Sequence, residues 1–200
     1  PIDAAAEERV SPTDDPAALL QSLRGQEDLA FESNPDNLID REFAEAAAHP
    51  RFNGIAEALK IDDLAFDKLR RTAALLFLAT DDFSALHGVT GMHAARILAD
   101  FAASRSAFAS ELWRAMLALY LALDRPALPE AAEVAKRVQQ DLPDLNRILP
   151  AAVYSEDEHA INLVFTCLEE TRAGGGRIYR YLAARKAGLL NKGTEAASAA

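Results

Sequence analysis

The sequence predicts an all-α protein, and three observations lead to this prediction. Alanine is abundant and β-branched residues are few, a composition that favours helix over strand. Apolar residues recur at three- and four-residue steps through most of the chain, and no segment shows the alternation of a strand. Capping residues precede these segments, and proline or glycine follows them. We therefore expect a single multi-helix domain, orthogonal or bundle-like, with about eight to ten helices.

The N-terminal part begins with a polar arm at residues 1–13, which we expect to be flexible. Short helices are predicted after this arm. Proline follows the first pair of candidate caps, a common first residue of a helix. The pair His49-Pro50 ends the second helix, because a residue before proline avoids the helical region. The three helices are expected to begin after Asp14 or Asp15, after Asp36 or Asn37, and at Arg51.

Three longer, strongly apolar helices are predicted in the middle of the chain. Asp62 or Asp63 caps the first, whose segment AALLFLA is apolar all round and should be buried on more than one side. The second opens at the aspartates 81 and 82 and extends to about residue 101. Ser106 caps the third, which ends before Pro126.

Four further helices are predicted in the C-terminal part of the chain. The predicted domain as a whole comprises residues 14–188. Residues 128–141 are amphipathic, and Pro143 opens a short helix that ends near Pro150. Ser155 and Glu158 have the spacing of a capping box for a helix over 156–172. Three glycines separate it from the last helix, and residues 189–200 form a tail that we expect to be disordered.

Charge and cysteine content exclude several classes of function. The net charge of −10 argues against a nucleic-acid partner, because phosphate binding needs clustered lysine and arginine. No apolar run is long enough to span a bilayer. Cys167 is the only cysteine, so no intrachain disulfide forms, and we expect a cytoplasmic protein.

The helix over residues 81–101 carries two of the four histidines, His87 and His93, with Thr90 between two glycines. Six residues turn a helix by roughly 600°, which leaves the two imidazoles about 120° apart. They cannot bind one metal ion without a kink, and the chain has no HExxH or CxxC motif, so no metal site is predicted. The helix is either a tightly packed core element or the wall of a site.

A second candidate lies in the run SEDEH at residues 155–159. Polar residues follow it at three- and four-residue steps, which is typical of a solvated face but also fits a wet cleft. If this face meets His87 or His93, imidazoles and carboxylates could carry out acid–base chemistry. The polar positions are His159, Asn162, Thr166 and Glu169 or Glu170.

Three segments, FSALHGVTGMHAARIL, ELWRAMLALYLAL and SEDEHAINLVFTCLEE, resemble the C-terminal half of the questin oxidase-like family in order and spacing. The resemblance runs from about His49 to Tyr181. It implies an oxidoreductase, because fungal members open a ring of anthraquinone-type polyketides by a Baeyer–Villiger-like oxygen insertion, with NADPH as the implied reductant. The residues themselves identify no cofactor.

The resemblance also supplies candidate site residues. It implies that His87, His93 and His159 are catalytic. Family members usually carry a further N-terminal half with additional histidine-containing helices. The implied partners are therefore a small aromatic substrate and either an N-terminal partner half or a second copy of the chain. The candidate substrate-binding residues are Thr90, Arg96, Trp113, Tyr120, Asp157 and Glu158.

Two hypotheses remain open at this stage. The first is an oxidoreductase, and it predicts that His87 or His93 converges with residues 157–159 on a shared cavity. The second is a non-catalytic helical module for binding or assembly, in which the histidines are structural. It predicts separated histidines and an exposed apolar surface.

Overall fold

A computed structural model of the chain describes residues 10–30 and 39–190. Within these residues it contains ten α-helices, two short 3₁₀ helices and no strand, so the all-α prediction is confirmed. The α-helices are α1 (Pro16–Ser22), α2 (Ile39–Ala47), α3 (Phe52–Glu57), α4 (Ala65–Thr80), α5 (Phe83–Leu98), α6 (Arg105–Ala122), α7 (Ala131–Gln139), α8 (Leu145–Tyr154), α9 (Glu158–Arg172) and α10 (Arg177–Lys186), and the 3₁₀ helices are η1 (Glu27–Leu29) and η2 (Ala99–Phe101).

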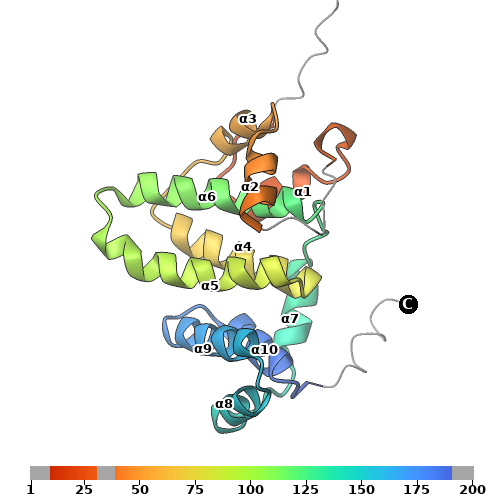
Figure 1. Ribbon diagram of the computed structural model, residues 1–200, viewed down its shortest axis with the longest axis vertical. Helices are drawn as coiled ribbons and strands as arrows, with labels where there is room; N and C mark the ends of the chain where they lie inside the picture. Colours follow the sequence, from red (N-terminus) through yellow and green to blue (C-terminus); the bar gives the residue numbers. More distant parts are fainter. Residues whose placement is uncertain (1–9, 31–38, 191–200) are drawn as a thin grey trace, which may run out of the picture.

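The helices are stacked in layers (Figure 1). Helix α6 lies against α2 and α3 on one side and against α4 and α5 on the other. Helices α9 and α10 form the next layer, and α8 packs outside α9. The AALLFLA segment of α4 is buried on several sides, as predicted, because α4 contacts α1, α5, α6 and α10.

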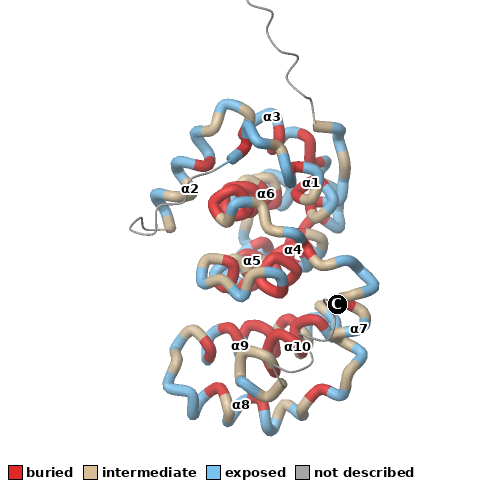
Figure 2. The backbone as a smooth tube through the Cα atoms, turned by 90° about the vertical axis from the view of Figure 1, so that its right-hand side faces the viewer, coloured by how far each residue is buried: buried red, intermediate tan, exposed pale blue. Residues whose placement is uncertain are grey.

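The hydrophobic core lies between these layers, where the helices face one another, as the buried parts of the tube in Figure 2 show. Its two largest side chains are Trp113 and Tyr120 of α6. The Trp113 indole N–H donates to the carbonyl of Ala56 at 3.0 Å, and the Tyr120 hydroxyl donates to the carbonyl of Pro126 at 3.1 Å. Both polar atoms are therefore satisfied inside the core.

Several predicted helix starts are confirmed at the level of the cap. The Asp15 carboxylate accepts hydrogen bonds from the N–H groups of Ala17 and Ala18, and Asp82 caps α5 in the same way. The predicted start at Ser106 is wrong by two residues. Ser104 caps α6 instead, because its hydroxyl reaches the N–H of Ala107.

The predicted capping box at Ser155 is also wrong. Helix α9 begins at Glu158, and its cap is Asp157, whose carboxylate accepts from the N–H of His159 at 2.9 Å. Ser155 instead donates its hydroxyl to the carbonyl of Ala152 and so closes α8. Glu156 lies between the two helices with a left-handed backbone (φ 56°), which sets the turn.

Helix α8 passes through Pro150, where the sequence predicts its end. Proline lacks one N–H, and here it stands shortly after the first turn, so the helix loses a single hydrogen bond. Ile148 and Ala152 are buried on either side of it, and α8 packs against α9. This packing offsets the missing bond.

The predicted arm and tail make contacts where the structure describes them. Thr13 exchanges backbone hydrogen bonds with Ala58 and Lys60, and Leu189 and Leu190 pack against the core. Residues 1–9 of the predicted arm and 191–200 of the predicted tail lie outside the described residues, as do the candidate caps Asp36 and Asn37. The boundaries of the domain at 14 and 188 stay a prediction.

The two glycines of α5 differ in their surroundings. A Cβ atom on Gly88 would stand 2.8 Å from Cδ2 of Leu119, so this glycine allows α5 to approach α6 closely. A Cβ atom on Gly91 would meet nothing within 4 Å. The packing of the described residues therefore explains Gly88 but not Gly91.

We expect opposite effects from alanine at these two positions. Alanine is a better helix former than glycine by about 1 kcal/mol, so Gly91→Ala should stabilise the fold of the single chain by about this amount. At Gly88 the new methyl group crowds the buried Leu119, and overpacking of this kind costs about 1–3 kcal/mol. Urea unfolding at one fixed protein concentration measures both variants. Equal stabilisation by the two substitutions would contradict the close contact at Gly88.

Candidate functional site

The two histidines of α5 point to different environments. His87 is exposed, whereas His93 is buried. The separation follows from the rotation of the helix between them, as expected. Each imidazole belongs to a cluster of its own.

His87 belongs to a ring cluster at the start of α5 and α9. The ring of Phe83 lies 4.6 Å from that of His87 and 4.8 Å from that of His159, measured between centroids. The centroids of the two imidazoles are 5.8 Å apart, in an edge-on arrangement. Residues from distant parts of the chain thus meet because α9 begins beside α5.

Asp157 holds His159 in this cluster. Its carboxylate caps α9 and lies 3.6 Å from Nδ1 of His159, while Nζ of Lys186 lies 3.5 Å from its other oxygen. Partial burial pushes the pKa of Asp157 up, but the N–H groups of Ala160 and His159 and the Lys186 ammonium outweigh it, and the pKa is lowered. The ionised Asp157 carboxylate therefore lies beside the His159 imidazole.

A pocket of about 220 Å³ lies between α2, α5 and α6, next to this cluster. Among the described residues of the lining, His87 and Ser84 alone have side chains with a polar group, and the rest are apolar or glycine. His87 therefore both lines the pocket and contacts His159, which is not part of the lining. The lining residues are Ile39, Phe43, Ser84, His87, Gly88, Gly91, Met92, Leu112, Ala115, Met116 and Leu119.

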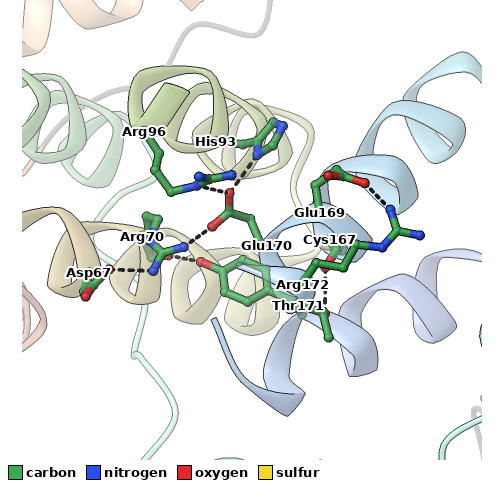
Figure 3. A network of polar contacts seen from close by, with 10 residues as sticks. Asp67, Arg70, His93, Arg96, Cys167, Glu169, Glu170, Thr171 and Arg172 are labelled. Atoms are coloured by element: carbon green, nitrogen blue, oxygen red, sulfur yellow. Dashed lines mark hydrogen bonds and ion pairs between the residues drawn. The ribbon is translucent and has the colours of Figure 1, made fainter. Parts of the chain in front are cut away.

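His93 belongs to a buried ionic network around Glu170 (Figure 3). Glu170 lies on α9 and is only 1% exposed. Its Oε1 accepts hydrogen bonds from Nδ1 of His93 at 2.7 Å and from Nε of Arg96 at 2.8 Å. Its Oε2 accepts from Arg70 of α4. One carboxylate thus joins α4, α5 and α9.

The network extends beyond Glu170 through Arg70. The Arg70 guanidinium also contacts the Asp67 carboxylate at 2.5 Å. The backbone carbonyl of Arg70 accepts a hydrogen bond from the Tyr179 hydroxyl of α10 at 2.9 Å. Burial raises the pKa of Tyr179, so the hydroxyl stays protonated and donates. The fourth helix, α10, is tied to the same cluster.

Glu170 is ionised in this network. Burial by itself raises the pKa of a carboxyl group, but the hydrogen bonds from His93, Arg96 and Arg70 outweigh it, and the pKa of Glu170 is lowered. An ionised carboxylate only accepts, so Nδ1 of His93 carries the proton and donates. Nε2 of His93 has no hydrogen-bond partner among the described residues, and the imidazole lies edge-on to the ring of Phe165, with 6.3 Å between the two ring centroids.

The structure separates seven of the nine predicted site residues into three groups. His87, His159 and Asp157 come together, while His93 and Arg96 belong to the Glu170 network. Trp113 and Tyr120 lie in the core and do not line the pocket, and burial raises the pKa of Tyr120 to about 12. Thr90 donates its hydroxyl to the carbonyl of His87, and Glu158 is exposed on the first turn of α9. Their roles in a reaction stay predictions.

Sequence reasoning did not identify Glu170 as a centre of the structure. It appeared only as one end of the polar face of the α9 segment. Its partners stand 74, 77 and 100 residues away, and no local pattern indicates such pairs. The useful signal was the short polar face itself, since Thr166 and Glu170 on it are buried.

Two further observations concern the kinds of site present. Among residues 10–30 and 39–190 no three histidine, cysteine or acidic side chains are grouped as metal ligands. No helix in the same residues combines the length and apolar character needed to cross a bilayer.

Comparison with known proteins identifies the family. The family model described as questin oxidase-like matches residues 2–167, and the chain belongs to this family. The match begins earlier than the predicted His49 and ends before the predicted Tyr181, so it includes the His87–His159 cluster but stops short of Glu170. Searches of curated proteins and of solved structures find no match.

Replacing the central carboxylate should destabilise the fold. Glu170→Gln leaves Arg70 and Arg96 facing a neutral group, and removing one member of a buried ion pair costs about 3–5 kcal/mol. Because the folded-state pKa of Glu170 lies below its ordinary value of 4.5, the wild type has this contribution above pH 4.5 and loses it as the pH falls further. We therefore expect the free energy of unfolding of the wild type to exceed that of the variant by the full amount at neutral pH. This difference should become smaller in acid.

Urea unfolding of both proteins at neutral and acidic pH measures this difference in the free energy of unfolding. The control is Glu169→Gln, which removes a partly exposed carboxylate that pairs with Arg172 on the same helix. Such surface pairs contribute about 0–1 kcal/mol, so this variant should stay close to wild type. If the difference in free energy of unfolding between wild type and Glu170→Gln did not change with pH, the charge of Glu170 would not be what stabilises the network.

Proposed function

We propose that this member of the questin oxidase-like family is an oxidoreductase for a hydroxylated, aromatic, polyketide-like substrate, and that His87 and His159 provide its acid–base chemistry. The observation that carries the proposal is the position of His87. It belongs to the lining of a pocket whose other described residues, apart from Ser84, are apolar or glycine, and it lies against a second imidazole, His159, which is paired with a carboxylate.

The pocket suits a planar apolar ring better than a polar ligand. An apolar cavity of roughly 150 Å³ holds a benzene ring, so about 220 Å³ accommodates one substituted ring, and a larger fused system would extend outside. Phe43 offers an aromatic contact, and Met92 and Met116 offer thioethers, which pack well against ring edges. His87 and Ser84 then remain to orient a hydroxyl or carbonyl group.

His87 is placed to take the proton of a phenolic hydroxyl on the bound ring. The resulting phenolate is electron-rich and reacts more readily with an oxidant than the neutral phenol does. His159 lies beside His87 and against the Asp157 carboxylate, so it can relay a proton between the site and water. The oxygen insertion implied by the family adds one atom of dioxygen to a ring carbon–carbon bond and releases the other as water, with two electrons from a reductant.

The described residues of this pocket do not fit NADPH, the reductant that the family resemblance implies. A dinucleotide needs cationic or backbone N–H groups for its pyrophosphate and a site far larger than one ring. The lining contains no lysine or arginine. No step of the proposed acid–base chemistry therefore passes through NADPH.

A second candidate function is a non-catalytic module for binding or assembly. It is favoured by the structural role of His93 in the Glu170 network and by the exposed phenylalanines 83, 101 and 165. In this case the pocket would bind an aromatic ligand or side chain without turning it over. The partners we propose for the first function are the aromatic substrate and an N-terminal partner half, in the cytoplasm, where the single buried Cys167 stays reduced.

The decisive experiment compares histidine variants in an oxygen-consumption assay with a panel of hydroxyanthraquinones. General acid–base catalysis contributes about 10²- to 10⁴-fold, so we expect His87→Ala to lower kcat/KM by this factor. His159→Ala should cause a smaller loss, because His87 still lines the pocket. The matched control is His49→Ala, whose two ring nitrogens bond to the backbone of Asp28 and Arg51.

Turnover that is equal in wild type and in both site variants would remove the proposed roles of His87 and His159. Binding of the same compounds, measured by fluorescence titration, distinguishes the two candidate functions. Saturable binding that is weakened by filling the pocket with Ala115→Trp, without any turnover, would support the binding module instead.

A further inference from the structure

The outer side of α5 and η2 is exposed and carries no charge. Helix α5 lies in front of α4 in Figure 1, and none of the labelled helices covers the side that faces the viewer. In Figure 2 this side of α5 is exposed or intermediate, while the side toward α4 is buried. We call it the α5 face, and its residues are Phe83, His87, Thr90, Gly91, Ala94, Ile97, Leu98 and Phe101.

These residues form one continuous stripe. At about 100° per residue the members of the stripe that lie on α5 fall within a sector of about 120°, and Phe101 follows them on η2. The charged residues of the segment, Arg96 and Asp100, lie outside this sector. A surface helix normally presents its polar side to water, so the α5 face is unusual for a helix of a monomer.

The packing of the chain does not account for this stripe. Phe83, Leu98 and Phe101 are 55%, 56% and 84% exposed. Gly91 stands in the middle of a sixteen-residue helix, where glycine costs about 1 kcal/mol relative to alanine, yet a Cβ atom there would touch nothing. Small residues at 90, 91 and 94 between large apolar ends leave room for another helix to approach.

Six of the eight residues of the α5 face are arranged symmetrically in size, and only Gly91 and Leu98 have no counterpart on it. Around residue 92 the large Phe83 mirrors Phe101, His87 mirrors Ile97, and Thr90 mirrors Ala94. Two copies of the helix, packed antiparallel about a two-fold axis at this point, therefore place small residues at the crossing and large ones at both ends. A two-fold interface requires such self-complementarity, because residue i meets residue j and j meets i.

We propose that the α5 face is the interface of a symmetric homodimer, in which the second copy also covers the His87–His159 cluster. In the antiparallel register, Ile97 of the second copy lies opposite His87, and its Phe101 lies opposite Phe83. The two phenylalanines then shield the imidazole pair from water on its open side. The covering of the cluster rests on the proposed function, whereas the dimer itself does not.

The exposed apolar area is sufficient for such an interface. A phenylalanine side chain can bury about 200 Å², so the exposed parts of Phe83, Phe101 and the neighbouring Phe165 of α9 amount to roughly 400 Å². Ile97, Leu98 and Ile161 add further apolar surface. Together they approach the lower end of the standard interface size, roughly 600 Å² per partner.

Charge also favours a second copy at this face. Each chain carries a net charge of −10, so two copies repel each other over most of their surfaces. The α5 face brings no charged side chain of one copy against the other, and the nearby Asp100 is paired with Arg105 at 2.9 Å. Contact through this face therefore avoids the like-charge cost that contact elsewhere would carry.

Analytical ultracentrifugation of the full chain tests the proposal. We expect the wild type to sediment as a dimer and Ala94→Arg, at the crossing point, to sediment as a monomer with unchanged helical circular dichroism. Ala94 is exposed, so its arginine variant can fold as a monomer. The matched control is Val153→Arg on α8, which replaces another exposed apolar side chain and should leave the dimer intact. A monomeric wild type, or a dimeric Ala94→Arg protein, would overturn the proposal.

The register is tested by a charge exchange. Phe83→Lys and Phe101→Glu should each abolish the dimer, and the double variant should restore it, because the antiparallel register places Lys beside Glu in both halves. A double variant that stays monomeric would overturn the antiparallel register. Neither measurement depends on turnover. A monomeric protein would therefore leave the predicted effect of His87→Ala on turnover unchanged, and an inactive protein would not contradict the dimer.

Discussion

The buried carboxylate of Glu170 is the interaction on which the arrangement of the central helices depends. It is inaccessible to water, and an isolated charge in such a place would cost several kcal/mol. Arg70 and Arg96 neutralise it and His93 adds a directed hydrogen bond, so α9 is stable only where all three side chains meet. The position of α9 in turn fixes where its first residues lie. His159 reaches His87 because Glu170, three turns further along α9, is held against α5.

Helix α5 consequently has three faces with separate tasks. His93 and Arg96 face the Glu170 network, and Gly88 allows contact with Leu119 of α6 and so shapes one wall of the pocket. The third face is exposed and uncharged. His87 stands at the border of the pocket and the exposed face, so it is the one residue of α5 that can act on a ligand from either side. The rotation of the helix between residues 87 and 93 separates a functional candidate from a structural one.

The sequence predicts the fold class and much of the helix pattern, because both depend on local chemistry. Alanine content, three- and four-residue spacing and the caps at Asp15 and Asp82 are properties of neighbouring residues. The angle between His87 and His93 follows from helix geometry alone. The Glu170 network depends instead on residues far apart in the chain, which have no common period. The same limit applies to Trp113 and Tyr120, since an apolar helix does not reveal whether its aromatic residues line a pocket or fill the core. At Ser155 the local pattern was ambiguous, and the stronger acceptor, the Asp157 carboxylate, became the cap.

The exposure of His87 connects the two proposals. Acid–base groups act most strongly on a substrate when water is excluded, because charges interact more strongly at low dielectric. In a single copy of the described chain His87 is exposed to solvent and His159 is only partly buried, so the pair lacks this advantage. The surface beside it is apolar, uncharged and symmetric in its pattern of sizes, and a covering helix there would exclude water from the pair. Catalysis and assembly are therefore not competing explanations of α5. The same exposed face that suggests an assembly module is the surface whose covering would complete the site.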